Sequence, residues 1–401
     1  MVDRVEDVPA IPLNPLNPVY LYRMSSVVII GPAHPLRGGL ASFNERLARQ
    51  YQSMGHRVAV YTFSLQYPGF LFPGTTQYSS EPAPDDLDIR VRINSVNPFN
   101  WLSVGRELKR QAPDLIVVRF WLPFMGPCLG TVLRIAKRNR RTRVVCIADN
   151  VIPHEKRPGD RVFTRYFLRS VDAFVTMSRK VLSDLRGFEP DKPAEFVSHP
   201  LYDNFGEAVP REEARKRLGL PAEGPLLLFF GFIRPYKGLD LLLEAMADPR
   251  IRERGIRLVV AGEFYTDRQP YLEAVSRLGI ADLVILRTDF IPDSEVRYYL
   301  CAADLVVQPY RSATQSGVTP LSYHFEKPML VTRVGALPDM VPDGKVGVVV
   351  EPDPPSIAEG VLRCFDMGIE SFLPHLREEK KKYTWLRLVE TIQSLADAVQ
   401  K

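Results

Sequence analysis

The sequence lacks the features that mark disulfide-rich, zinc-binding and membrane-spanning proteins. Its four cysteines, at positions 128, 146, 301 and 364, show no CxxC spacing and no paired arrangement, so they indicate neither a disulfide framework nor a zinc site. No stretch reaches the roughly 18 consecutive apolar residues that a transmembrane helix requires. A reducing cytoplasm is therefore the expected location.

The first residues also lack the apolar core of a signal peptide. Residues 1–23 contain acidic side chains and four prolines, which is the composition of a disordered extension. Met24 directly precedes the first apolar segment, so we expect translation to begin at either Met1 or Met24.

The overall composition is that of a globular protein, with 401 residues, 45% of them apolar and 25% charged. This length suffices for two domains, and the composition excludes a disordered, collagenous or coiled-coil chain. Residues 1–200 hold 27 Lys and Arg against 18 Asp and Glu, whereas residues 201–401 hold 25 against 29. The basic cluster RIAKRNRRTR (134–143) is either a solvated helix end or a surface for anionic lipid or an acidic acceptor.

The segment LLLFFGFIRPYKGLDLLLEAM (226–246) predicts a strand, a glycine-flanked loop and a helix. Five apolar residues suit a strand buried on both faces, and apolar residues resume at helical spacing after Gly238. Such a loop places backbone N–H groups and a helix N-terminus at the carboxyl edge of a parallel sheet. Because this loop also carries Arg234 and Lys237, it predicts a polyphosphate site; the alternative is an ordinary turn with two solvated cations.

The same alternation of strand, loop and helix recurs along the chain, which predicts a doubly wound α/β architecture. The first strand is followed by GPAHPLRGGL, where Gly38 and Gly39 allow a ligand to approach the backbone closely. A polar connector predicts a domain boundary between about His199 and Pro210. We expect strands at 27–30, 57–63, 115–120, 143–148, 173–177, near 196, and at 226–230, 257–261, 284–286, 305–309 and 328–332, with helices between them and a final helix at 384–399.

Three further segments carry candidate site residues. ADNVIPHEKRPGDR places Asp149 and His154 beyond the end of a strand, and RSATQSG (311–317) places hydroxyl and amide groups at a helix start. The irregular segment 64–88 carries aromatic residues, including Tyr67 and Phe72, that either form an exposed lip for an apolar acceptor or pack the loop down. Its acidic triplet, DLD at 86–88, is interpreted as surface charge.

Taken together, these segments resemble a retaining glycosyltransferase of the GT-B fold, similar to the large family-4 group. The resemblance rests on GFIRPYKGLDLLLEA, ADLVVQPY with SATQSGV, and EKPMLVTRVGALPDMV with GKVGVVVEP. It implies two Rossmann-like doubly wound domains facing a central cleft. The implied organisation is a disordered extension (1–23), an acceptor domain (24–205), a nucleotide-sugar donor domain (206–383) and a terminal helix packing back on the first domain (384–401).

The resemblance also implies roles for individual residues. Arg234 and Lys237 would hold the donor diphosphate and, with Asp149 and His154, form the catalytic set. No metal and no cofactor are implied, and the donor nucleotide, UDP or GDP, is left open. The implied donor-binding residues are Gly38, Gly39, Gly231, Glu263, Asp289, Phe290, Thr314, Gln315, Ser316, Gly317 and Val318.

Two departures from the family pattern affect these assignments. Many members carry two glutamates eight positions apart, where this chain has Thr314 and Ser322, or Ala313 and Leu321. The histidine that commonly follows a strand of the first domain is replaced by Asp149. Because neither choice of positions supplies a carboxylate, the donor sugar and the binding of the ribose are both left open. Front-face transfer needs no protein nucleophile, because the leaving diphosphate accepts the acceptor's proton.

The expected function is transfer of a hexose from a nucleotide-sugar to a glycan or lipid-linked acceptor. The protein is expected to work in the cytoplasm, with peripheral contact at the inner face of the membrane through its basic first domain, and without a nucleic-acid partner. The alternatives are a nucleotide-sugar epimerase of the same architecture and a non-catalytic nucleotide-sugar binding protein.

Overall fold

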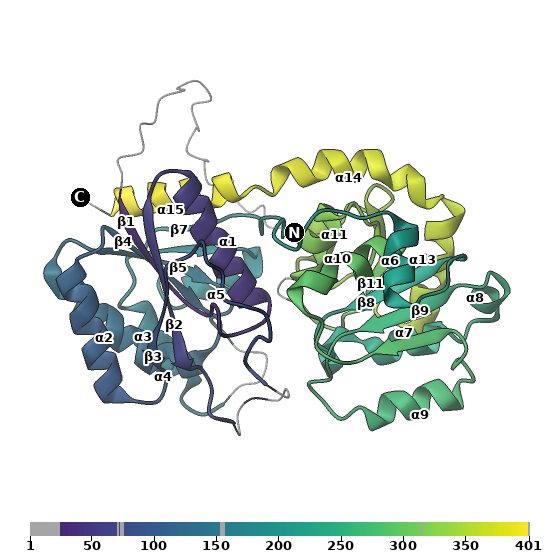
Figure 1. The fold of residues 1–401 in the computed structure, drawn as a ribbon, viewed down its shortest axis with the longest axis horizontal. Coiled ribbons are helices and arrows are strands. Elements are labelled where there is room, and N and C mark those ends of the chain that lie inside the picture. Colours follow the sequence, from purple (N-terminus) through teal and green to yellow (C-terminus); the bar gives the residue numbers. More distant parts are fainter. Residues whose placement is uncertain (1–24, 70–71, 73–75, 153–156, 314–315, 400–401) are drawn as a thin grey trace, which may run out of the picture.

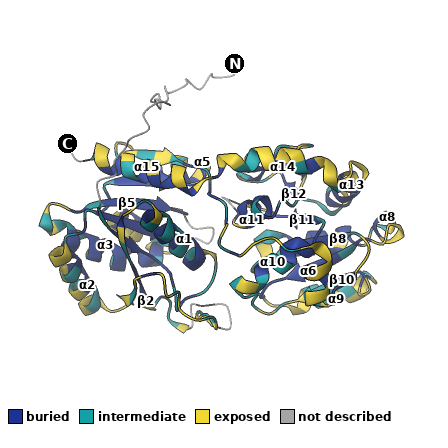
Figure 2. Ribbon diagram, turned by 45° about the horizontal axis from the view of Figure 1, so that its top comes forward, coloured by how far each residue is buried: buried dark blue, intermediate teal, exposed yellow. Residues whose placement is uncertain are grey.

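The computed structural model describes residues 25–69, 72, 76–152, 157–313 and 316–399. They form two α/β domains that lie side by side along the long axis of the molecule, each built on one parallel sheet (Figure 1). Most of the strands are buried, except the edge strands β3 and β7, and the helices expose their outer faces (Figure 2). The expected class of two doubly wound domains is confirmed.

The first sheet has seven parallel strands in the order β3-β2-β1-β4-β5-β6-β7. Its strand β1 pairs with β2 on one side and β4 on the other, so the winding reverses between β1 and β4. Ligands bind at such a switch point in open α/β sheets. The strands are β1 Ser26–Ile30, β2 Arg57–Leu65, β3 Ile89–Asn94, β4 Leu115–Phe120, β5 Arg143–Ala148, β6 Ala173–Thr176 and β7 Ala194–Phe196.

Helices cover both faces of this sheet because alternate side chains of its strands point to opposite sides. In β1, Val27 and Ile29 belong to the core beneath α1, whereas Val28 and Ile30 belong to the core beneath α2, α3 and α4. The helices are α1 Gly39–Ser53, α2 Pro98–Gln111, α3 Gly126–Ala136, α4 Asp160–Leu168 and α5 Arg179–Arg186, with 3₁₀ turns at Pro123–Met125 and Lys137–Asn139.

The second sheet has six parallel strands in the order β10-β9-β8-β11-β12-β13, with its own reversal between β8 and β11. Its strands are β8 Leu226–Phe230, β9 Arg257–Ala261, β10 Val284–Arg287, β11 Leu305–Gln308, β12 Met329–Thr332 and β13 Gly347–Val350. Its helices are α6 Arg211–Leu218, α7 Leu239–Ala245, α8 Pro249–Glu253, α9 Gln269–Arg277, α10 Asp293–Ala302, α11 Val318–His324, α12 Leu337–Met340, α13 Pro354–Asp366 and α14 Leu373–Glu379, and its 3₁₀ turns are Pro235–Lys237, Ile369–Phe372 and Lys380–Lys382.

The chain crosses between the domains twice, and the two crossings touch. The Leu201 N–H donates a hydrogen bond to the Tyr383 carbonyl at 3.1 Å, and the Trp385 indole donates to the Leu201 carbonyl at 2.7 Å. After the second crossing, helix α15 (Trp385–Ala398) packs on α1, β5 and β6 of the first domain. Figure 1 shows this returning segment in yellow across the top of both domains.

The segment 64–88 pairs and packs against the rest of the first domain. The carboxylates of the DLD triplet pair at the surface, Asp86 with Arg49 at 2.6 Å and Asp88 with Arg90 at 2.7 Å, as the surface-charge interpretation predicts. Tyr67 packs down, because its hydroxyl accepts a hydrogen bond from the Trp121 indole at 2.5 Å. Helix α2 was not assigned from the sequence, since it buries only a narrow stripe of residues. Residues 1–23, with their expected disorder, lie outside the described residues.

None of the described helices is both long and apolar enough to cross a bilayer. In the same part of the chain, no three His, Cys, Asp or Glu side chains gather as metal ligands.

The packing of α15 predicts a difference between two neighbouring leucines. Leu388 is fully buried, whereas Leu386 is 45% exposed. We expect Leu388→Ala to lower the free energy of unfolding by about 2–5 kcal/mol because it leaves a cavity. Leu386→Ala should change it by less than about 0.5 kcal/mol. Urea unfolding followed by circular dichroism measures both, and equal effects would contradict the described packing.

Candidate active site

The loop that follows β8 is shaped by glycines that no other residue can replace. Gly238 has φ +67°, and a Cβ atom added there would lie 2.0 Å from the Pro309 carbonyl oxygen. A Cβ atom on Gly262 would lie 2.3 Å from the Gly231 carbonyl oxygen. The ends of β8, β9 and β11 therefore pack backbone against backbone, and the turn that carries Arg234 and Lys237 is held at the carboxyl edge of the sheet.

Arg234 and Lys237 form a cationic pair in this turn. The Arg234 guanidinium lies 5.1 Å from the centroid of the Tyr265 ring, and the Lys237 ammonium lies 5.8 Å from the Tyr310 ring. Within the described residues neither cation pairs with a carboxylate. Burial and the neighbouring Arg234 charge lower the pKa of Lys237 to about 7. An anion that enters here would satisfy both charges.

The loop that follows β11 contributes a second polar group. The Ser316 hydroxyl accepts a hydrogen bond from the Val318 N–H at 3.2 Å and lies 3.2 Å from the Tyr310 hydroxyl. Tyr310 thus lies between this loop and Lys237. Thr314 and Gln315, which were predicted to bind the donor, lie outside the described residues.

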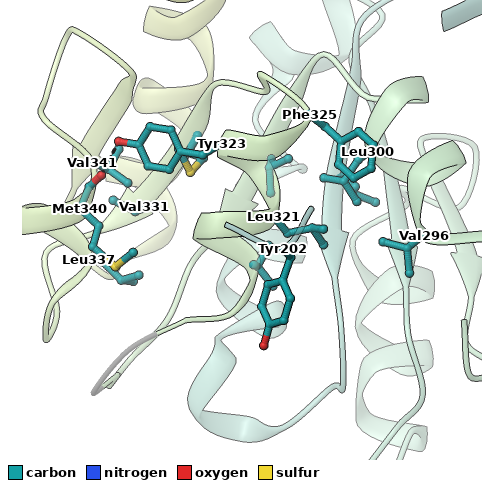
Figure 3. Close-up of a cluster of buried hydrophobic side chains, with 14 of the residues drawn as sticks. Tyr202, Val296, Leu300, Leu321, Tyr323, Phe325, Val331, Leu337, Met340 and Val341 are labelled. Carbon is teal, nitrogen blue, oxygen red and sulfur yellow. Dashed lines mark hydrogen bonds between the residues drawn. The ribbon is translucent and has the colours of Figure 1, made fainter. Parts of the chain in front are cut away.

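Tyr202, in the first crossing between the domains, links the two predicted glycine positions. Its hydroxyl donates a hydrogen bond to the Gly39 carbonyl at 3.2 Å, and a Cβ atom on Gly317 would lie 3.4 Å from its ring. Figure 3 shows the ring beside Leu321, with its hydroxyl pointing away from the hydrophobic cluster. The start of α1 and the start of α11 therefore meet across one buried phenol.

An ion pair joins the domains where the loops after β1 and β9 meet. The Arg37 guanidinium lies 2.5 Å from the Glu263 carboxylate, and each side chain is only 7% exposed. The guanidinium also stacks on Phe290, 3.8 Å from the ring centroid, and donates to the Thr76 carbonyl at 2.8 Å. Arg37 of the first domain thus contacts both Glu263 and Phe290, which were predicted to bind the donor.

Aromatic rings continue this contact between the domains. Phe232 stacks on Tyr265 at 4.2 Å and lies 6.4 Å from Phe290, and Phe72 of the first domain meets the edge of Tyr265 at 5.7 Å. Gly38 lies beside Phe232, since a Cβ atom on Gly38 would be 3.7 Å from that ring. The site therefore has an aromatic wall that was not predicted from the sequence.

Asp149 occupies a buried position in the first domain. Its two carboxylate oxygens accept hydrogen bonds from Arg119, both at 2.7 Å, and the side chains are 6% and 3% exposed. The Arg119 guanidinium in turn stacks on Phe43 at 3.9 Å. This bidentate pair fixes Asp149 at the carboxyl end of the sheet, beside the switch point. His154 lies outside the described residues.

Both halves of the chain match known glycosyltransferase families. Residues 224–367 match the family described as Glycosyl transferases group 1, and residues 38–198 match the Glycosyl transferase 4-like domain. The chain belongs to the group 1 glycosyltransferases. It is therefore a transferase, as the sequence resemblance predicted.

Similar proteins span most of this glycosyltransferase. A D-inositol 3-phosphate glycosyltransferase of Acidothermus cellulolyticus is 27% identical over 373 residues, which cover 84% of this chain and 80% of that protein. The solved structure of Thermosynechococcus elongatus sucrose-phosphate synthase has a TM-score of 0.70 at 16% identity, and Anabaena HepE in complex with UDP-glucose has 0.69 at 16%; each match covers 93% of this chain and 100% of the other. These neighbours confirm the GT-B fold.

The glycosyltransferase brings together most of the described residues that were predicted to bind the donor. Arg234, Lys237 and Gly231 share one loop, where the Lys237 ammonium lies 3.1 Å from the Cβ position of Gly231. Asp289 lies exposed in the loop after β10. Asp149 belongs to the first domain, where its charge and that of Arg119 act on the Tyr202 hydroxyl. Arg37 and Arg119 have roles that the sequence did not show, because their partners are distant in the chain.

The pKa of Lys237 predicts that nucleotide affinity depends on pH. Above about pH 7 the free protein loses the Lys237 proton, whereas a bound diphosphate raises this pKa and retains the proton. Binding then takes up a proton, so the affinity for UDP should fall by up to about tenfold per pH unit. The phosphate charge stays constant in this range because its last pKa is about 6.

Isothermal titration calorimetry between pH 7 and pH 9 measures this dependence. Lys237→Arg is the matched control, since a guanidinium stays charged throughout. The variant should bind UDP with a flat pH profile. The same slope in both proteins would assign the proton to another group.

Proposed function

We propose that this glycosyltransferase moves a hexose, with retention and without a metal ion, from a nucleotide-diphospho-sugar to a glycan or lipid-linked acceptor. The observation that carries the proposal is the pair Arg234 and Lys237, two cations without a carboxylate partner among the described residues. A donor diphosphate supplies the opposing charge. The pair also stabilises the charge that grows on the diphosphate as it departs.

The names of similar proteins support a nucleotide-sugar donor. The Acidothermus relative is named as a D-inositol 3-phosphate glycosyltransferase, and the HepE structure contains UDP-glucose. UDP-glucose is therefore the first donor to test. Phe290, one of the residues predicted to bind the donor, has a ring face on which a nucleotide base could stack, and Arg37 covers this face in the structure. A base at this loop must stack over Arg37 or displace it.

The proposed reaction needs no protein nucleophile. The acceptor hydroxyl oxygen bonds to the anomeric carbon while the bond from that carbon to the diphosphate breaks, and the proton passes to a departing phosphate oxygen. Asp149 and Glu263 are each bound by an arginine, which suits positioning and charge balance better than nucleophilic attack. Catalysis then consists of aligning two substrates and stabilising the leaving group.

Removing either cation should therefore slow transfer. We expect Arg234→Ala and Lys237→Ala each to cost about 2–4 kcal/mol of transition-state stabilisation, seen as a loss of kcat/KM. Release of UDP from UDP-glucose in the presence of acceptor measures it. Arg252→Ala is the control, because Arg252 pairs with Asp282 at the surface, at 2.7 Å, and should leave the rate unchanged. Full activity in both site variants would refute the diphosphate assignment.

The donor class can be identified without knowing the acceptor. We expect one nucleotide series among UDP, GDP and ADP, with its sugar derivatives, to raise the melting temperature. A ligand at about 100 times its Kd adds roughly 2.7 kcal/mol of stability. Arg234→Ala should abolish the shift. Interconversion of nucleotide sugars without acceptor would indicate an epimerase instead, and binding without turnover across an acceptor panel would indicate a binding protein.

The proposed setting is the cytoplasm, at the inner face of the membrane. Support comes from the four buried free cysteines, which suit a reducing compartment, and from the positive charge of residues 1–200.

A further inference from the structure

The outer face of α4 carries a stripe of arginines. Arg161, Arg165 and Arg169 are spaced four residues apart, which places them along one side of the helix. All three are exposed. No ion pair or hydrogen bond joins their side chains to any other described residue. Their charge is thus available to a partner outside the domain.

Apolar side chains lie beside this stripe. Val162 is 67% exposed and Phe163 is 39% exposed, although Phe167 and Leu168 on the inner side of the same helix are fully buried. The helix is held tightly, because a Cβ atom on Gly126 of α3 would lie 2.3 Å from the Phe163 carbonyl oxygen. The outward apolar residues therefore add nothing to the core and indicate a contact surface.

Another exposed apolar side chain lies on helix α2, which packs on α3 as α4 does. Its Phe99 is 83% exposed, more than any other described large hydrophobic residue. Helices α2 and α4 both pack against α3 (Figure 1); α2 begins four residues after β3, and the start of α4 lies against Gly126, at the start of α3, and against the Val151 carbonyl after β5. Their first turns consequently lie at the carboxyl edge of the first sheet, the edge that faces the site. We call Phe99 with the outer face of α4 (residues 161–163, 165, 166 and 169) the α4 surface.

We propose that the α4 surface docks on a bilayer that carries anionic head groups. An arginine stripe beside exposed Val and Phe side chains is the pattern of helices that lie in the membrane interface, where lipid phosphates neutralise the cations and the apolar groups enter the acyl boundary. This deepens the proposed function, since it brings the acceptor domain to a lipid-linked substrate. The contact itself can be tested separately from transfer.

The basic cluster at 134–143, which the sequence singled out, is a weaker candidate. Lys137 pairs with Asp172, Arg141 with Asp114 at 2.8 Å, and Arg143 with Asp397 at 3.2 Å. Arg138 and Arg140 remain exposed without a partner among the described residues. The cluster joins the end of α3 to the start of β5, so it lies at the amino edge of the sheet, away from the site.

Co-sedimentation with vesicles compares the two surfaces. The full chain should bind vesicles of phosphatidylcholine with 30% phosphatidylglycerol more tightly than vesicles of phosphatidylcholine alone. Arg161→Gln with Arg165→Gln should weaken this binding roughly thirtyfold, because each arginine near an anionic surface contributes about fivefold. Arg138→Gln with Arg140→Gln removes the same charge and should leave the binding within about twofold.

A second variant tests the apolar part. Phe99→Ser with Val162→Ser keeps the charge and should weaken binding at least about tenfold, as expected when exposed apolar groups enter the interface. Melting temperatures check that all variants fold. The proposal is overturned if the full chain does not bind anionic vesicles, or if the two arginine pairs matter equally. Such a result would leave the nucleotide-dependent rise in melting temperature, and hence the transferase proposal, unaffected.

Discussion

Direct contact between backbones at the carboxyl edge of the second sheet determines where the charged groups lie. Side chains cannot enter between Gly231 and Gly262, or between Gly238 and Pro309. The turn that carries Arg234 and Lys237 is therefore positioned by main chain rather than by adaptable side chains. Burial of the Lys237 ammonium, together with the nearby Arg234 charge, is unfavourable when no anion is bound, and it lowers the pKa of Lys237. The strain is relieved when an anion binds.

The contacts between domains use a different principle. Tyr202 contacts the starts of two helices through its ring and its hydroxyl. Arg37 and Glu263 form an ion pair between loops of opposite domains. A buried ion pair of this kind contributes little net stability, because desolvation offsets the attraction, but it penalises every arrangement that separates the partners. It therefore specifies how the domains face one another more than it stabilises either of them.

The parts predicted correctly from the sequence are those encoded by neighbouring residues. Buried strands appear in the sequence as short apolar runs. Arg234 and Lys237 lie in the loop of the strand–loop–helix segment 226–246, which was predicted from such a run. The pair Arg119 and Asp149 was not predicted because β4 and β5 bring together residues 30 positions apart. The density of charge in a segment does not by itself show which cations are unpaired. Three of the six cations in the cluster at 134–143 pair with distant carboxylates, whereas the arginines of α4 are spread along a helix and are not conspicuous in the linear sequence.

The return of α15 to the first domain has a consequence for synthesis. Leu388, Val389 and Ile392 complete a core whose other members, such as Phe43 and Leu47, leave the ribosome more than 300 residues earlier. The apolar groove that α15 later fills therefore stays exposed in the first domain while the entire second domain is made. The groove therefore closes only after the second domain has been made, and until then it exposes apolar side chains that favour association with other chains.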